Sequence, residues 1–184
     1  AYFDVSQFPQ DLNKDFIKIS KQIVTKDTKG IILDMRNNPG GYISAAEDLL
    51  QHFLPVNSTM YYLDYRSGDR VTKSSRTPDL TGYPMVILID ASSASAAEIV
   101  VAALRDHKVA TIIGQKSFGK GVAQQLFFYD DGSSLKLTIA EWLSPNKIRI
   151  NKEGILPDIE ALDRPETVTD EALDRAIKFF KNGN

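Results

Sequence analysis

The sequence contains no cysteine, which excludes disulfide bonds, thiolate zinc sites and cysteine nucleophiles. Histidine is also scarce: His52 and His107 are the only two, and neither has a partner at the spacing of a metal ligand. The chain therefore implies no metal site. It also offers few histidines that could act as a catalytic base.

Long apolar runs and blocks of like charge are absent too. No stretch reaches the length of a membrane span, and the N-terminus has no signal-peptide pattern. The 22 basic and 24 acidic residues are spread along the chain and give a net charge of −2, so nothing indicates a nucleic-acid partner or an anionic membrane. With 184 residues, 42% of them hydrophobic, the sequence predicts one domain over residues 1–184.

Apolar runs alternate with segments of helical periodicity. Runs typical of strands buried on both faces lie at residues 30–35, 85–89 and 109–113. Helical spacing of apolar residues occurs at residues 10–25, 43–54, 96–105 and 169–181. This alternation predicts an α/β domain with a largely parallel sheet. Hairpins are predicted at residues 60–72 and 127–142, and a further strand at residues 1–8.

The glycine-rich run at residues 114–121 admits three interpretations. A phosphate-binding loop needs Ser or Thr after Lys120 and then a helix, but Gly121 and a strand-like segment follow. The Ser-x-x-Lys motif of penicillin-binding enzymes would place Ser117 and Lys120 on one helix face. The flanking glycines disfavour that helix, and the companion motifs Ser-Asp-Asn and Lys-Thr-Gly are absent. The third interpretation is a hydrolase in which Lys120 activates Ser95.

Ser95 lies between a predicted buried strand and a predicted helix. The segment Ser95-Ala-Ala-Glu98 has the form of a capping box, which by itself favours an N-cap that serves the helix backbone. The same position suits a nucleophile, because free N–H groups at a helix N-terminus, such as that of Ala96, can stabilise an oxyanion. Lysine can act as the base when burial lowers its pKa from ~10.4. Lys120, next to Phe118, is the lysine best placed to be buried.

Two further positions could complete such a site. Gln124 could accept a hydrogen bond from the lysine ammonium, although alone it is equally a strand-surface residue. Gly40-Gly41 follows a buried strand, permits positive φ and could expose a second oxyanion donor, although Pro-Gly-Gly is more often only a turn.

Four segments carry a longer pattern: Leu33–Gly41, Ser93–Ile99, Ile113–Gly121 with Gln124, and Gly154–Asp158. In this order they resemble the motifs of carboxyl-terminal processing proteases, also called tail-specific proteases, and the resemblance covers residues 1–160. It implies a Clp-protease/crotonase-like α/β core, with a largely parallel buried sheet flanked by helices, plus β-hairpins. It also implies a serine endopeptidase that cleaves proteins near their C-termini through an acyl-enzyme.

By this resemblance Ser95 is the nucleophile, Lys120 the general base and Gln124 its orienting partner. The N–H groups of Gly41 and Ala96 would form the oxyanion hole. No metal or organic cofactor is implied. The implied partners are protein or peptide substrates with flexible C-terminal tails, not nucleic acid, and the implied location is extracytoplasmic. Whether the chain forms a homo-oligomer stays open.

One departure from the family concerns substrate capture. Family proteases usually carry a PDZ domain ahead of the strand that corresponds to residues 1–8, and this chain contains none. We therefore expect residues 1–184 to be a serine–lysine protease core that binds tails weakly.

Two other classes of function stay open. A non-catalytic module on the same fold could bind peptides or apolar ligands, but it would need none of Ser95, Lys120 and Gln124. A crotonase-type acyl-CoA enzyme gains no support from a serine–lysine pair. The presence of both residues favours the peptidase.

Overall fold

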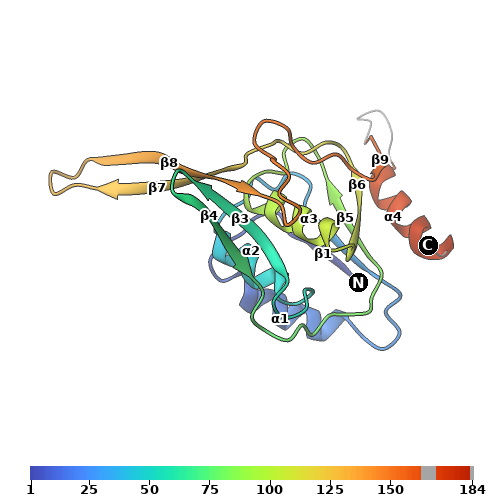
Figure 1. Ribbon diagram of the computed structural model, residues 1–184. Helices are drawn as coiled ribbons and strands as arrows, with labels where there is room; N and C mark the ends of the chain where they lie inside the picture. Colours follow the sequence, from blue (N-terminus) through green and yellow to red (C-terminus); the bar gives the residue numbers. More distant parts are fainter. Residues whose placement is uncertain (163–168, 183–184) are drawn as a thin grey trace.

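A parallel sheet organises the larger part of the molecule in the computed structural model, which describes residues 1–162 and 169–182 (Figure 1). Its strand order is β1-β2-β5-β6-β9. The strands are β1 (Tyr2–Asp4), β2 (Ile31–Asp34), β5 (Met85–Ile89), β6 (Ala110–Gly114) and β9 (Ile159–Glu160). The predicted buried strands are thus confirmed, and the sheet is parallel throughout.

Helices cover both faces of this sheet. One face carries α1 (Leu12–Ile23), α2 (Ile43–Leu50) and α3 (Ala96–Asp106), and the other carries α4 (Glu171–Asn182) (Figure 1). Alternate strand residues serve the two faces: Ile31 and Leu33 join the core under α1–α3, whereas Ile32 packs with Ala172 and Ala176 of α4. Because each buried aliphatic side chain stabilises by about 1.5–3 kcal/mol, both faces favour apolar strands. None of the helices in the described ranges is long and apolar enough to cross a membrane.

A second, antiparallel sheet lies beside the first, in the order β4-β3-β8-β7. It contains β3 (Thr59–Tyr65), β4 (Gly68–Lys73), β7 (Val122–Phe128) and β8 (Ser134–Leu143). The two predicted hairpins, β3–β4 and β7–β8, are confirmed. The β7–β8 hairpin projects away from the rest of the molecule (Figure 1).

Two details differ from the sequence prediction. The strand β9 was not predicted, because two residues carry no periodicity. The apolar stripe of α1 is only partly buried: Phe16 lies in the core, whereas Ile19 is 43% exposed and Ile23 38% exposed.

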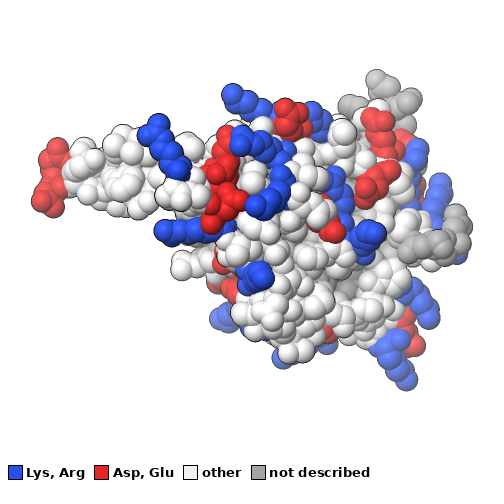
Figure 2. Space-filling view, viewed as in Figure 1, with Lys and Arg blue, Asp and Glu red and all other residues white. Residues whose placement is uncertain are grey.

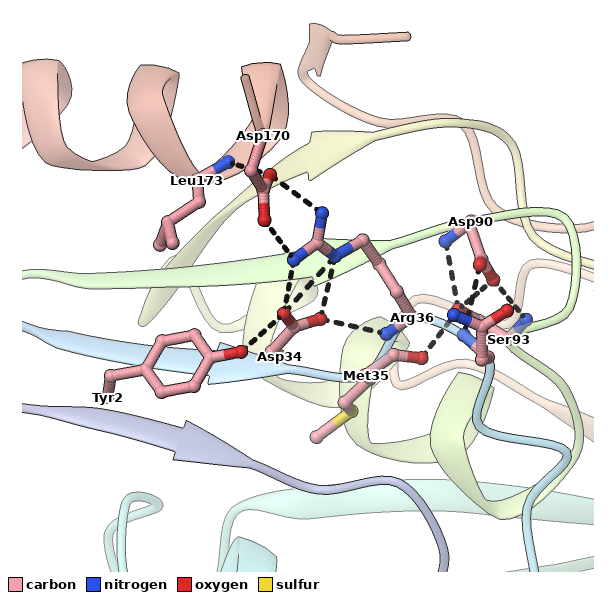
Figure 3. Close-up of polar contacts among 9 residues, drawn as sticks. Tyr2, Asp34, Met35, Arg36, Asp90, Ser93, Asp170 and Leu173 are labelled. Carbon is pink, nitrogen blue, oxygen red and sulfur yellow. Dashed lines mark hydrogen bonds and ion pairs between the residues drawn. The ribbon is translucent and has the colours of Figure 1, made fainter. Parts of the chain in front are cut away.

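An ion pair fastens α4 to the end of β2 (Figure 3). The Arg36 guanidinium donates to both carboxylate oxygens of Asp170 at 2.8 Å, and it also binds Asp34. Asp170 is at the same time the N-cap of α4, since its Oδ1 accepts the N–H of Leu173 at 2.9 Å. The hydrogen bond from Arg36 lowers the pKa of Asp170.

Replacing Asp170 with Asn should therefore make the stability difference from the wild type depend on pH. Asn caps a helix as well as Asp does, so Asp170→Asn can keep the cap, but it removes the charge and one of the two oxygens that accept hydrogen bonds from Arg36. The Asp170 pKa is lowered in the folded state, so its contribution is fully present above the unfolded pKa of ~3.9 and is lost as the pH falls through the lower pKa of the folded state. Because this pair is partly exposed, we expect a loss of about 0.5–1 kcal/mol at pH 7 that shrinks as the pH falls towards 3.

Thermal or denaturant unfolding from pH 3 to pH 8 measures this difference. The variant Asp170→Ala serves as the control, since it also removes the cap and should lose a further ~1 kcal/mol at all pH values. A gap between Asp170→Asn and the wild type that stays constant with pH would contradict the assignment.

Candidate active site

Three loops leave the parallel sheet at the carboxyl ends of its strands, the edge at which open α/β sheets place their ligand sites. They cover residues 35–41, 90–95 and 115–121. Backbone hydrogen bonds hold the three together: Ala94 N–H donates to the Asn38 carbonyl at 2.9 Å, and Phe118 N–H donates to the Ser93 carbonyl at 3.0 Å. The fold thus brings three of the four sequence motifs to one place.

Side chains of the middle loop brace this arrangement from inside (Figure 3). Ser93 Oγ donates to the Met35 carbonyl at 2.8 Å, and Asp90 Oδ1 accepts the N–H of Ser93 at 3.0 Å. The other oxygen of Asp90 accepts the N–H of Asn37 at 3.0 Å. The loop that carries Ser95 is therefore fixed against the loop that carries Gly41.

Ser95 is the N-cap of α3 and has an unusual backbone conformation. Its φ of 57° and ψ of −118° lie near the first central position of a type II′ turn, which glycine dominates. A residue with a side chain in such a region stores about 1–3 kcal/mol of strain, and strain of this kind clusters at functional sites. The capping box predicted from the sequence is present, since the Ser95 N–H donates to the Glu98 carboxylate at 2.9 Å.

Glu98 is completely buried, and its carboxylate joins the nucleophile loop to the lysine loop. Its oxygens accept hydrogen bonds from Ser95 N–H (2.9 Å), Lys120 N–H (2.8 Å), Gly119 N–H (2.7 Å) and Ser117 Oγ–H (2.6 Å). One side chain thus holds the backbones of both residues predicted to do chemistry. The sequence had indicated only the bond to Ser95.

Lys120 is exposed, so the predicted burial of this lysine is wrong. Glu98 lies beneath the loop and binds its N–H groups, which turns the backbone inward and the lysine side chain outward. Phe118, predicted to help bury the lysine, is itself 64% exposed. Lys108 and Lys116 are exposed as well.

Ser117, the rival nucleophile, is buried and has both of its hydrogen-bonding functions in use. Its hydroxyl donates to Glu98 at 2.6 Å and accepts the N–H of Ile155 at 2.7 Å. The Ser117 backbone also pairs with Ile155, because its N–H donates to the Ile155 carbonyl at 3.0 Å. The fourth motif, Gly154–Asp158, therefore supports the lysine loop from behind.

The glycine loop presents one N–H group that has no acceptor in the described part of the chain. Gly40 N–H is used, since it donates to Asn38 Oδ1 at 2.8 Å, whereas Gly41 is exposed and donates to no described residue. A Cβ on Gly40 would lie 2.8 Å from the Cβ of Ser95, so only glycine allows this close approach. The N–H of Ala96, at the first position of α3, likewise donates to no described residue.

Gln124 lies on β7, beside the bulge between Ala123 and Gln124, and is exposed. Among the described residues, no hydrogen bond joins Ser95 Oγ to Lys120 Nζ or Lys120 Nζ to Gln124. The fold places these three residues on adjoining loops and on the strand that follows, without bonding their side chains to one another.

Both histidines have other hydrogen-bonding partners. His52 is buried and bonds through Nδ1 to Asp79 at 2.6 Å and through Nε2 to Asn13 at 2.9 Å. His107 closes α3 and contacts the Thr59 carbonyl through Nε2 at 2.7 Å. Both rings therefore serve structural contacts.

Similarity to known proteins decides the family. The sequence profile described as Peptidase family S41 matches residues 1–161. The chain belongs to peptidase family S41. Carboxy-terminal processing protease CtpB of Bacillus subtilis is 36% identical over 166 residues, which are 90% of this chain and 34% of that protein. The carboxyl-terminal-processing protease of Synechocystis is 37% identical over 165 residues, 90% of this chain and 38% of that one.

Solved structures place the fold among S41 peptidases. The photosystem II D1 C-terminal processing protease superimposes with a TM-score of 0.79 and 28% identity, over 95% of this chain and 45% of that one. The tricorn protease, at 17% identity and a TM-score of 0.66, shares the fold. These matches confirm the predicted Clp-like α/β architecture. The S41 chain described here spans about a third of the length of the curated relatives it matches.

In this S41 chain, Glu98→Gln should damage both the fold and the site. Glutamine has one acceptor oxygen and an NH₂ donor. The NH₂ group would face N–H groups whose hydrogen bonds the Glu98 carboxylate now accepts. Leaving two buried donors without partners costs about 2–5 kcal/mol. We expect that loss in urea unfolding, together with a fall in kcat on a peptide substrate.

Glu153→Gln is the matched control, because Glu153 is exposed and lies beside the same loop. It should unfold and react as the wild type does. A Glu98→Gln variant with wild-type stability would show that the four hydrogen bonds contribute little.

Proposed function

We propose that this chain is the catalytic core of a serine endopeptidase that cleaves polypeptides near their C-termini. Ser95 is the nucleophile, Lys120 the general base, and Gln124 the residue that orients the lysine. The N–H groups of Gly41 and Ala96 form the oxyanion hole. The observation that carries the proposal is the Glu98 carboxylate, which ties the backbones of Ser95 and Lys120 together in a family of peptidases.

In the first half of the reaction, neutral Lys120 Nζ takes the proton of Ser95 Oγ as the oxygen attacks the scissile carbonyl carbon. The negative charge that develops on the carbonyl oxygen receives hydrogen bonds from the N–H groups of Gly41 and Ala96. The C–N bond then breaks, the lysine ammonium gives its proton to the leaving amine, and an ester to Ser95 remains.

Water completes the cycle. Lys120 takes a proton from the water molecule as it attacks the ester carbonyl, and it returns that proton to Ser95 Oγ when the ester bond breaks. The products are the new carboxylic acid and free enzyme. No group outside the chain, the peptide and water enters these steps.

Because Lys120 is exposed, the bound substrate itself would have to shield this side chain from water. A neutral lysine is favoured where water is excluded. In this structure Lys120 is exposed, so a bound polypeptide that covers the side chain would supply that exclusion. Catalysis then depends on occupancy of the site.

A serine-reactive fluorophosphonate tests the proposal. The probe should label the protein, and peptide mapping should place the adduct on Ser95. Absence of labelling together with retained peptide binding would favour a non-catalytic module on the same fold.

The finer parts of the proposal concern tails and location. Action on flexible C-terminal tails and an extracytoplasmic location rest on the relatives, whose names include C-terminal processing proteases and a chloroplastic peptidase. We also propose that residues 1–184 act as one protease core domain.

A further inference from the structure

The outer half of the β7–β8 hairpin is a two-stranded ribbon whose outer edges pair with no other strand of the described residues. The strand β3 pairs with β8 only at Glu141, Trp142 and Leu143. Among the described residues, the part of β8 before Glu141 therefore pairs with β7 alone. A two-stranded hairpin is marginally stable by itself in water. The outer backbone N–H and C=O groups of this ribbon are therefore available to pair with another extended segment.

The ribbon is also unusually apolar for an exposed element. Its exposed large hydrophobic residues are Leu126 (51%), Phe127 (37%), Phe128 (79%), Tyr129 (53%), Leu135 (42%) and Leu137 (44%). In the space-filling view the projecting arm is mostly uncharged, with acidic side chains gathered at its tip (Figure 2). The register places Phe127, Tyr129, Leu135 and Leu137 on one face of the ribbon and Leu126 and Phe128 on the other, and exposed apolar residues gathered in this way mark an interaction site.

The register shows which backbone groups of β7 face the free edge. Tyr129 N–H donates to the Ser133 carbonyl at 3.0 Å, so Tyr129 points its backbone groups towards β8. Alternate residues of an antiparallel strand then point the other way. In β7 these are Phe128 and Leu126, which lie opposite Ser134 and Lys136.

We propose that this free edge of β7 binds the polypeptide substrate as an added β-strand, an inference that rests on the proposed peptidase function. The argument is continuity: β7 begins at Val122, two residues after Lys120, and is the outermost strand of its sheet. A polypeptide paired with β7 would therefore extend along this strand towards Lys120, the proposed general base.

The chemistry of this edge defines the occupant. Strand addition uses main-chain hydrogen bonds, which accept many sequences, and the side chains of the edge strand select the residues beside them. The exposed Leu126 and Phe128 favour an extended, unfolded polypeptide with apolar side chains at alternate positions. A folded protein offers such a strand only at an exposed sheet edge or in an unfolded tail.

A pair of proline variants tests the edge. Leu126 and Lys136 lie directly opposite each other, and each points its N–H to the outer edge of its own strand. Proline is tolerated where the N–H faces outward, so Leu126→Pro blocks the β7 edge and Lys136→Pro blocks the β8 edge, while the ladder between the strands is kept. On an unfolded peptide substrate, Leu126→Pro should raise KM about threefold to tenfold with little change in kcat, and Lys136→Pro should leave KM unchanged.

Substrates with single N-methyl groups provide the second arm. If the peptide pairs with β7, methylation at alternate residues should weaken its binding to the Ser95→Ala variant in a fluorescence-anisotropy assay, and the residues between should tolerate it. Uniform tolerance, or equal effects of the two proline variants on KM, would overturn the inference. A dimer in light scattering that Leu126→Pro dissociates would overturn it too, since a second copy would then be the occupant.

These results are separable from the proposed function. If the protein hydrolyses peptides and is labelled at Ser95, but N-methylation has the same effect at every peptide position, the peptidase function is supported and the binding of substrate to the β7 edge is refuted. If N-methylation weakens binding only at alternate positions and Ser95 is not labelled, peptide binding at the β7 edge is supported and the peptidase function is refuted.

Discussion

Ser95→Ala should lose peptidase activity almost completely, by about 10⁶-fold in kcat, the scale on which serine nucleophiles act. The residue lies at the N-terminus of α3, beside the N–H of Ala96, and in a strained backbone conformation that presents its side chain from a sharp turn. Residual catalysis from the oxyanion hole and from binding would be all that remains. Hydrolysis of a peptide and labelling by a fluorophosphonate both measure the loss.

Two variants separate loss of the nucleophile from loss of the fold. Ser95→Gly removes the hydroxyl and also relieves the positive φ, so it should be inactive yet more stable than Ser95→Ala by about 1–3 kcal/mol. Ser117→Ala should keep the label and most of the activity. It should lose about 1–3 kcal/mol of stability, since it leaves the Ile155 N–H without its acceptor. If Ser117→Ala is inactive while Ser95→Ala still cleaves, the nucleophile is misassigned.

Local patterns predicted most of the fold. Strands such as Met85–Ile89 are continuous apolar runs, and α3 begins at a capping box, so each element carries its own signal. The hairpin around Gly132 was predictable for the same reason, because a turn residue separates two β-type segments. The strand β9 has two residues and depends on its neighbour β6, which no local pattern reports.

The sequence predicted the individual residues of the candidate site but not the hydrogen bonds that join their loops. Ser95, Gly41 and Lys120 lie in motifs that the sequence shows, yet the hydrogen bonds that Glu98 accepts from Gly119 and Lys120 span 21 and 22 residues. Those bonds hold the backbone of a loop whose Lys120 side chain is exposed, which the neighbouring apolar residues could not reveal. The same holds for Arg36 and Asp170, which are 134 residues apart and meet only in the folded chain.

Lys120→Arg should be inactive, although it keeps the positive charge. Arginine stays protonated in proteins, so it cannot take the proton from Ser95 Oγ. With wild-type Lys120, kcat/KM should rise with pH, because only the neutral amine is a base. General bases contribute about 10²–10⁴-fold, and the variant should lose at least that factor in kcat.

Lys116→Arg is the matched control for this experiment. Lys116 is exposed on the same loop, four residues before Lys120, and should tolerate the change with full activity. Gln124→Ala should lose less than Lys120→Arg, since an orienting residue does not take the proton. Stopped assays of peptide cleavage from pH 6 to pH 10 compare all three with the wild type. An active Lys120→Arg enzyme with a flat pH profile would mean that the side chain serves only as a positive charge, and the base would then have to be sought elsewhere in the chain.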